Sequence, residues 1–251
     1  MLKLTLLAIP LLASTALAQD PGVPEQSNWS GAGSAGLIYM TGNNASVLSS
    51  ADVSSKYQVA GQRWLFSGKY AAVRQTDRVT DDAITSSRLY QGSVSHHRFL
   101  DDEDNLYLYG KGSARRNVPT GLQIREDLGV GAGYTWRWKD DDAQFSLEGG
   151  PSALKENNVA SASGAMALNG RAACNYENKL NEDLSTTFTA EFFQSFDVSA
   201  DRSVTAEAKL RWAMNGTWHL EAGVANAWDN TPATGFEKTD WIYTIQVGTS
   251  W

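Results

Sequence analysis

In the stretch Asp240–Trp251, written DWIYTIQVGTSW, aromatic or apolar residues alternate with mostly small or polar ones. The aromatic or apolar phase holds Trp241, Tyr243, Ile245, Val247, Thr249 and Trp251. The other phase is mostly small or polar and holds Ile242, Thr244, Gln246, Gly248 and Ser250. This period is that of a β-strand with two unlike faces. Because a soluble domain rarely ends on an aromatic strand, we expect the apolar face to meet lipid.

Composition favours a membrane protein that crosses with strands. Hydrophobic residues make up 42% of the chain, yet it contains 9 Trp, 9 Tyr, 8 Phe and 22 Gly. No stretch after residue 20 reaches the roughly 18 apolar residues of a transmembrane helix. In a transmembrane β-barrel only every second residue meets lipid, and aromatic side chains gather at the interfaces. The net charge of −7 argues against nucleic acid as a partner, and the single Cys174 cannot form an internal disulfide.

The first residues, MLKLTLLAIPLLASTALAQD, have the form of an export signal. Lys3 precedes an apolar run, and Ala16-Leu17-Ala18 supplies the small residues that signal peptidase reads. The sequence therefore predicts a cleaved signal peptide at 1–18, a leader at 19–28 and one barrel domain at 29–251.

Alternating segments separated by turns continue back through the chain from its last strand. They predict an all-β fold, a closed antiparallel up-and-down barrel of about twelve strands. The predicted strands are 29–41, 46–59, 63–73, 85–99, 105–116, 128–138, 144–154, 164–178, 184–196, 203–214, 218–229 and 240–251. Connections alternate between short and long, with the exception of the short GNNA after the first strand, and this is the asymmetry of periplasmic and extracellular ends. Asn215-Gly216 predicts a two-residue hairpin.

The two phases assign side chains to the inside and the outside of this barrel. The predicted lumen charges are Lys69, Lys111, Arg115, Asp127, Arg137, Glu148, Arg171, Glu191, Glu207, Lys209, Arg211, His219 and Glu221, with Asp52 and Lys56 in the same phase. The predicted lipid-facing aromatics are Trp64, Phe66, Tyr134, Trp136, Trp138, Phe188, Phe192, Trp212, Trp218, Trp228, Trp241, Tyr243 and Trp251. A soluble calyx with its aromatic side chains packed inside is the alternative, since its charges would then face water.

Few of these residues are candidates for a catalytic, metal or cofactor site. His96 and His97 point to opposite strand faces and cannot share a metal. Ser95 and His97 share a face, an arrangement that would suit an outer-membrane lipid hydrolase, but no third orienting group is evident. Gly129, Gly131 and Gly133 loosely match a dinucleotide motif, yet they alternate within a strand and favour room on the inner wall. We therefore expect no enzyme, no cofactor and no metal site.

The mixed-sign lumen supports two functional hypotheses. In the first, the charges filter solutes in a narrow outer-membrane channel. In the second, they pair and close the lumen of a structural or barely permeable barrel. Lys111 and Arg115 are expected to face Asp127, and Lys209 and Arg211 to lie near Glu191 and Glu221. The absence of a single-sign charge ladder favours the closed barrel.

Two segments resemble a known family. NWSGAGSAGLIYMTGNNASVLSSADVSSKY, residues 28–57, resembles the opening of the YdiY-like salt-induced outer-membrane proteins, which carry a domain of unknown function. The shared features are Trp29, Gly31, Gly36, the turn at 41–43 and Tyr57, and LGVGAGY at 128–134 resembles the middle of that family. The resemblance implies a barrel in the bacterial outer membrane and a role in the salt response, and it supplies no activity.

The expected partners follow from that location. They are membrane lipids and lipopolysaccharide, with periplasmic chaperones and the barrel-assembly machinery during biogenesis. The closing strand is similar to the signal that this machinery reads, although most such signals end in Phe and this one ends in Trp251.

Overall fold

A computed structural model describes residues 28–40, 44–77, 83–118, 121–159, 164, 166–232 and 235–251. The predicted signal peptide 1–18 and all of the predicted leader except Asn28 lie outside these residues. No helix in the described part of the chain is long and apolar enough to cross a membrane.

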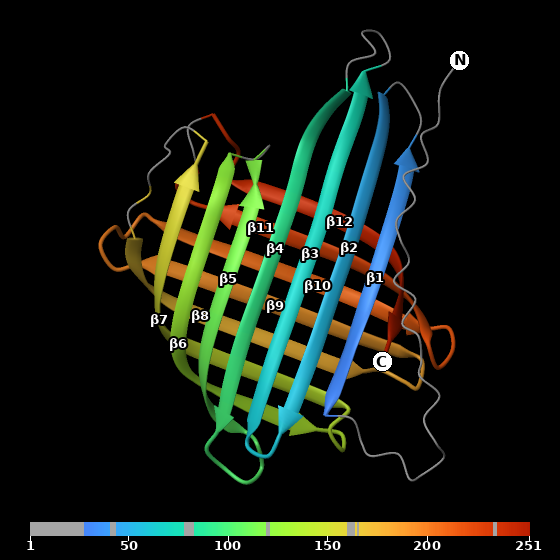
Figure 1. The fold of residues 1–251 in the computed structure, drawn as a ribbon, viewed down its shortest axis with the longest axis vertical. Helices are drawn as coiled ribbons and strands as arrows, with labels where there is room; N and C mark the ends of the chain where they lie inside the picture. Colours follow the sequence, from blue (N-terminus) through green and yellow to red (C-terminus); the bar gives the residue numbers. More distant parts are fainter. Residues whose placement is uncertain are drawn as a thin grey trace.

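Twelve strands close into one antiparallel barrel in which each strand pairs with its neighbours in the chain and β12 pairs with β1 (Figure 1). The strands are β1 Trp29–Met40, β2 Asn44–Val59, β3 Gln62–Asp77, β4 Ala83–Phe99, β5 Leu106–Asn117, β6 Leu122–Trp138, β7 Ala143–Asn158, β8 Met166–Lys179, β9 Leu184–Ser195, β10 Arg202–Ala213, β11 Trp218–Asp229 and β12 Thr239–Ser250. The predicted all-β meander barrel is confirmed.

Several strands are longer than predicted. β6 begins at Leu122 rather than 128, and β7 ends at Asn158 rather than 154. The missed ends carry charged residues on both faces, Arg125 opposite Glu156 on one and Glu126 opposite Lys155 on the other, so they lack the apolar phase that marks a strand. Backbone pairing between these two strands, and of β5 with the start of β6, extends them beyond the segment that the alternation defines.

The closing stretch has the two faces that its sequence predicts. Ile242, Thr244 and Gln246 are buried inside the barrel, whereas Trp241 and Ile245 are exposed on its outer surface. β12 pairs with β11 over its whole length, from Thr239 opposite Trp228 to Thr249 opposite Trp218. This pairing fixes which β12 side chains enter the lumen.

The seam between β1 and β12 is short. Its ladder runs from Ala32 opposite Ser250 to Ala35 opposite Val247. Gly31 and Trp251 extend it by exchanging backbone hydrogen bonds of 2.9 and 3.0 Å. A side chain at Gly31 would meet the Trp251 indole at 2.6 Å. Glycine at this position therefore lets the terminal tryptophan lie against β1.

The predicted two-residue hairpin at Asn215-Gly216 is wrong. β10 ends at Ala213 and β11 begins at Trp218, so four residues make the connection. The Asn215 side-chain oxygen accepts hydrogen bonds from the backbone N–H groups of Thr217 and Trp218, each at 2.9 Å. Asparagine stabilises this turn through its side chain, since such bonds compete with the tight hairpin turn.

Candidate functional site

A first ion-pair network joins β2 and β3 to β10 and β11. Lys69 on β3 bonds Glu207 on β10. Lys209 lies 3.0 Å from Glu221 and 3.4 Å from Asp52 on β2. Arg211 completes the network with a 2.9 Å bond to the same Glu221. Because β1 and β12 separate these strand pairs in the barrel order, the network spans the lumen.

A second ion-pair network lies among β5, β7, β8 and β9. Arg171 donates from Nε to Glu191 at 2.5 Å and from Nη1 to Glu148 at 3.0 Å. Lys111 donates to Glu191 at 2.5 Å from β5, which is separated from β9 by three strands in the barrel order. The Tyr107 hydroxyl donates to Glu148 at 3.1 Å. This network also joins separate parts of the wall.

Both networks balance their charges. The first sets Lys69, Lys209 and Arg211 against Asp52, Glu207 and Glu221. The second sets Lys111 and Arg171 against Glu148 and Glu191. Where the two networks lie, the charges cancel locally and present no field of one sign to a passing ion.

Two expected pairings are wrong. Asp127 was expected to face Lys111 and Arg115, but it sits opposite Ser113 in the β5–β6 register, and Lys111 reaches Glu191 instead. Glu191 was expected near Lys209 and Arg211, but it bonds Lys111 and Arg171. The register and cross-section of the barrel select these partners, and neither is visible in the strand pattern.

The remaining predicted lumen residues lie nearer the two ends. Arg137 is close to the short turns and donates to Asn105 Oδ1 at 2.5 Å and to the Asp104 carbonyl at 2.9 Å. His219 is buried, with its Nδ1 3.3 Å from the Ser250 hydroxyl. Arg115 and Asp127 lie toward the long loops, and Asp127 is 6% exposed with no hydrogen-bond partner within 3.5 Å in the described chain.

An aromatic cluster fills one side of the lumen near the short turns. His97 stacks on Tyr107 with ring centroids 4.5 Å apart and planes at 6°, and Phe99 meets the same ring edge-on. Tyr107 and Tyr109 lie over Gly133 and Gly131, where added side chains would come within 2.5 to 2.8 Å of the rings. The alternating glycines therefore make room on the inner wall.

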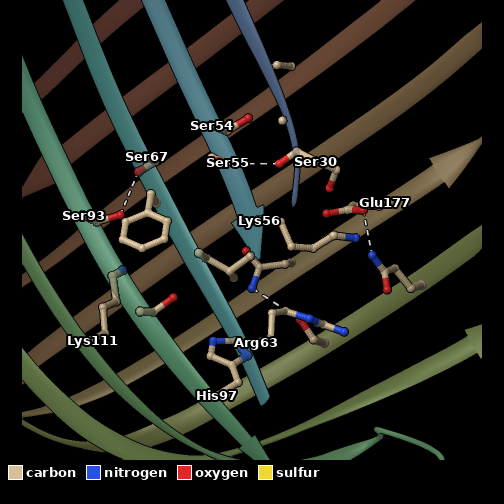
Figure 2. Close-up of a pocket in the computed structure, with 18 of the residues that line it drawn as sticks. Ser30, Ser54, Ser55, Lys56, Arg63, Ser67, Ser93, His97, Lys111 and Glu177 are labelled. Atoms are coloured by element: carbon tan, nitrogen blue, oxygen red, sulfur yellow. Dashed lines mark hydrogen bonds between the residues drawn. The ribbon is translucent and has the colours of Figure 1, made fainter. Parts of the chain in front are cut away.

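A cavity of about 690 Å³ adjoins this cluster at the short-turn end of the lumen. Figure 2 shows Lys56, Arg63 and His97 among the side chains that line it, with Glu177 also at its wall. A second cavity of about 430 Å³ lies toward the long loops and shares Lys111, Arg171 and Arg211 with the first. The two spaces therefore meet at the ion-pair networks.

An apolar contact lines the second cavity on its side toward the long loops. Ala71 on β3, Leu89 on β4 and Ile242 on β12 form one buried cluster, and Ala225 on β11 packs against it. Leu89 is 3% exposed. We call these four residues the apolar clamp. The sequence analysis missed it, although Leu89 and Ile242 stand as apolar residues in the inward phase of their strands.

The predicted lipid-facing aromatics lie on the outer surface. Twelve of them are 37–64% exposed, and Trp228 is partly covered, with the Arg202 guanidinium over its ring. Near the short turns aromatic side chains stack from strand to strand. Trp136 on β6 stacks on Phe145 of the adjacent β7, and Trp29 on Phe66 and Trp138 on Tyr176 stack across one intervening strand. A belt of aromatic side chains at one level is typical of a membrane interface.

Catalytic geometry is incomplete in the described chain. No hydrogen bond joins Ser95 to His97, whose Nε2 lies 3.7 Å from Glu148. The Ser250–His219 contact has no carboxylate on the opposite ring nitrogen, because His219 Nε2 has no hydrogen-bond partner. The described residues hold no group of three His, Cys, Asp or Glu placed to bind a metal ion.

These features define a class: a closed twelve-stranded antiparallel barrel with a polar, ion-paired interior and an aromatic exterior. The chain belongs to the family described as "Protein of unknown function, DUF481", whose model matches residues 33–251. The expected domain of unknown function is confirmed.

Some solved structures are similar to this chain. The NanC porin is 10% identical over 89% of this chain and 98% of its own, with a TM-score of 0.50. The translocator domain of the autotransporter NalP from Neisseria meningitidis is 13% identical over 89% of this chain and 85% of its own, with a TM-score of 0.41. Among curated proteins, none matches the chain in sequence.

Proposed function

We propose that this protein is an outer-membrane β-barrel with an occluded lumen, and that its role in the envelope is structural or barely permeable. The exposed aromatic belt supports insertion in lipid, and closure satisfies the strand backbones as a bilayer requires. The export signal at 1–18, contact with lipopolysaccharide, delivery by chaperones and the assembly machinery, and a link to salt stress belong to the same proposal.

The apolar clamp is the observation that carries the occlusion. Leu89 and Ile242 meet from different walls, and a hydrophobic constriction excludes water and ions by dewetting. The neutral ion-pair networks on the other side of the 430 Å³ cavity add to the barrier. The incomplete Ser–His contacts support a non-enzymatic role over a lipid hydrolase.

A narrow channel is the second candidate. The adjoining 690 and 430 Å³ cavities favour it, because together they occupy much of the lumen. The two functions differ in whether the apolar clamp and the ion pairs open.

Planar-bilayer recording of the purified chain separates them. The occluded barrel gives no steady conductance, whereas Leu89→Ala with Ile242→Ala opens measurable channels because the apolar clamp is removed. Leu128→Ala with Ile245→Ala, on the outer face, is the matched control and stays silent. Steady conductance of the wild-type protein would establish the channel instead.

A further inference from the structure

We propose that the 690 Å³ cavity at the short-turn end binds an anionic, polyhydroxylated solute such as a sugar acid. The cavity has the size of a small-molecule site, which is typically about 300–1,000 Å³. It carries three features that together select this chemistry: free basic side chains, a wall of hydroxyls and a buried imidazole with an unused nitrogen.

The basic side chains are Lys56 on β2 and Arg63 on β3. Neither has a carboxylate within 4.0 Å in the described chain, unlike Lys69, Lys111 and Arg171 deeper in the lumen. Arg63 donates to the neutral Gln58 at 3.2 Å and lies over the Phe99 ring at 4.8 Å, which leaves other guanidinium N–H groups for a ligand. Figure 2 shows both side chains in the same space.

The opposing acidic charge is smaller. Glu177, on the β8 wall of the cavity, accepts a 2.7 Å hydrogen bond from Gln144. Glu148 is already bonded to Arg171 and Tyr107. The space between Lys56 and Arg63 therefore favours an anion, and a guanidinium suits a carboxylate in particular.

Hydroxyl groups line the wall formed by β1 to β4. Ser30, Ser54, Ser67, Ser93 and Ser95 contribute to it. A serine hydroxyl both donates and accepts, so a row of them can match the hydroxyls of a polyol. Ser67 and Ser93 already bond each other at 2.7 Å, which shows that the wall holds its hydroxyls within bonding range.

His97 provides a specific polar contact. The residue is 5% exposed, its ring lies flat on Tyr107, and its Nδ1 has no hydrogen-bond partner among the residues that the structure describes. A buried polar atom without a partner is unfavourable. His97 lines the cavity, and Nδ1 is itself shielded, so a ligand hydroxyl would satisfy it after a local shift of the ring.

Isothermal titration of the full chain in detergent micelles tests the site, with D-glucuronate as the probe. Neutral D-glucose and cationic D-glucosamine are the matched ligands. Glucuronate is expected to bind saturably and at least about tenfold more tightly than glucose, since charge-assisted bonds exceed neutral ones. The titration measures binding and needs no voltage or conductance, so its result does not depend on whether the lumen is occluded.

Two variants locate the site. Arg63→Gln is expected to weaken glucuronate binding about tenfold, and His97→Phe, which keeps the stacking on Tyr107, about fivefold. Arg116→Gln, an exposed arginine on β5 near the long loops, leaves binding unchanged. Far-ultraviolet circular dichroism and a thermal melt verify that each variant is folded. Equal affinity for glucose and glucuronate, no saturable binding, or full binding by folded Arg63→Gln would overturn the proposal.

Discussion

Gly131 and Gly133 show how single residues shape the lumen. They leave space into which Tyr107 and Tyr109 of the neighbouring strand fold, and Tyr107 in turn supports His97 and donates to Glu148. A glycine in a strand weakens its packing, and here the tyrosine rings fill the space. The cavity wall and the second ion-pair network therefore share this support.

Substituting Gly133→Ala should destabilise the barrel by about 1–3 kcal/mol, as overpacking does. The added Cβ would lie 2.5 Å from Tyr107 Cζ, and the ring cannot retreat because it is 1% exposed. Urea unfolding from lipid vesicles measures the change. Gly110→Ala on β5 is the control, since a Cβ there meets nothing within 4 Å. Equal stability of the two variants would show that the ring has room to move.

The sequence predicted which side chains point into the lumen better than it predicted which residues form ion pairs there. The two-residue period placed Lys111, Glu191 and Lys209 in the inward phase, and all three lie inside. It paired Lys111 with Asp127 because they lie on adjacent strands, whereas the observed partner, Glu191, comes from four strands away. Such contacts depend on the shape of the cross-section, to which neighbouring positions in the chain contribute nothing.

Individual strands follow their alternation closely where one face is apolar. β12 and β11 begin and end within a residue of their predicted bounds, because their outer faces are mostly apolar and have tryptophan at or near both ends. β6 and β7 extend further than predicted, since their outer ends have polar residues on both faces. The alternation in this sequence thus marks the part of each strand whose outer face is apolar, and it does not mark the full length of the hydrogen-bonded strand.

Ile245→Lys tests which environment surrounds β12. Ile245 is near the middle of the strand and 55% exposed on the outer face. If that face meets acyl chains, the lysine costs about 2–4 kcal/mol in lipid vesicles. Thr217→Lys, in the exposed β10–β11 turn, should change the free energy of unfolding by less than about 0.5 kcal/mol. A harmless Ile245→Lys would place this face in water.

The whole molecule is held together across its interior as well as around its circumference. Figure 1 shows β1 to β5 running in front of β9 to β12 at a steep angle. Lys69–Glu207 and the apolar clamp connect these two sides. The sequence predicted a charged lumen but not the apolar clamp. The contact between Leu89 and Ile242 depends on how closely β4 and β12 approach each other across the lumen, and the sequence of neither strand contains that distance.

A double-mutant cycle on Lys69→Met and Glu207→Gln measures this cross-lumen tie. We expect a coupling free energy of about 1–2 kcal/mol, because the pair is largely shielded from water. The exposed pair Lys179–Asp142, 4.0 Å apart, is the control, with coupling below about 0.5 kcal/mol for Lys179→Met and Asp142→Asn. Equal coupling in the two pairs would mean that the walls are not tied at this point.

The short ladder between the first and last strands bears on how the ring forms and fails. β12 is zipped to β11 along its full length but to β1 only from Gly31 to Ala35. During insertion, hairpins can add one after another while the β1–β12 seam stays open. Closing the barrel then requires few new backbone hydrogen bonds between β1 and β12. The β1–β12 seam is also where a strained barrel would open first, since local opening begins where the fewest hydrogen bonds must break.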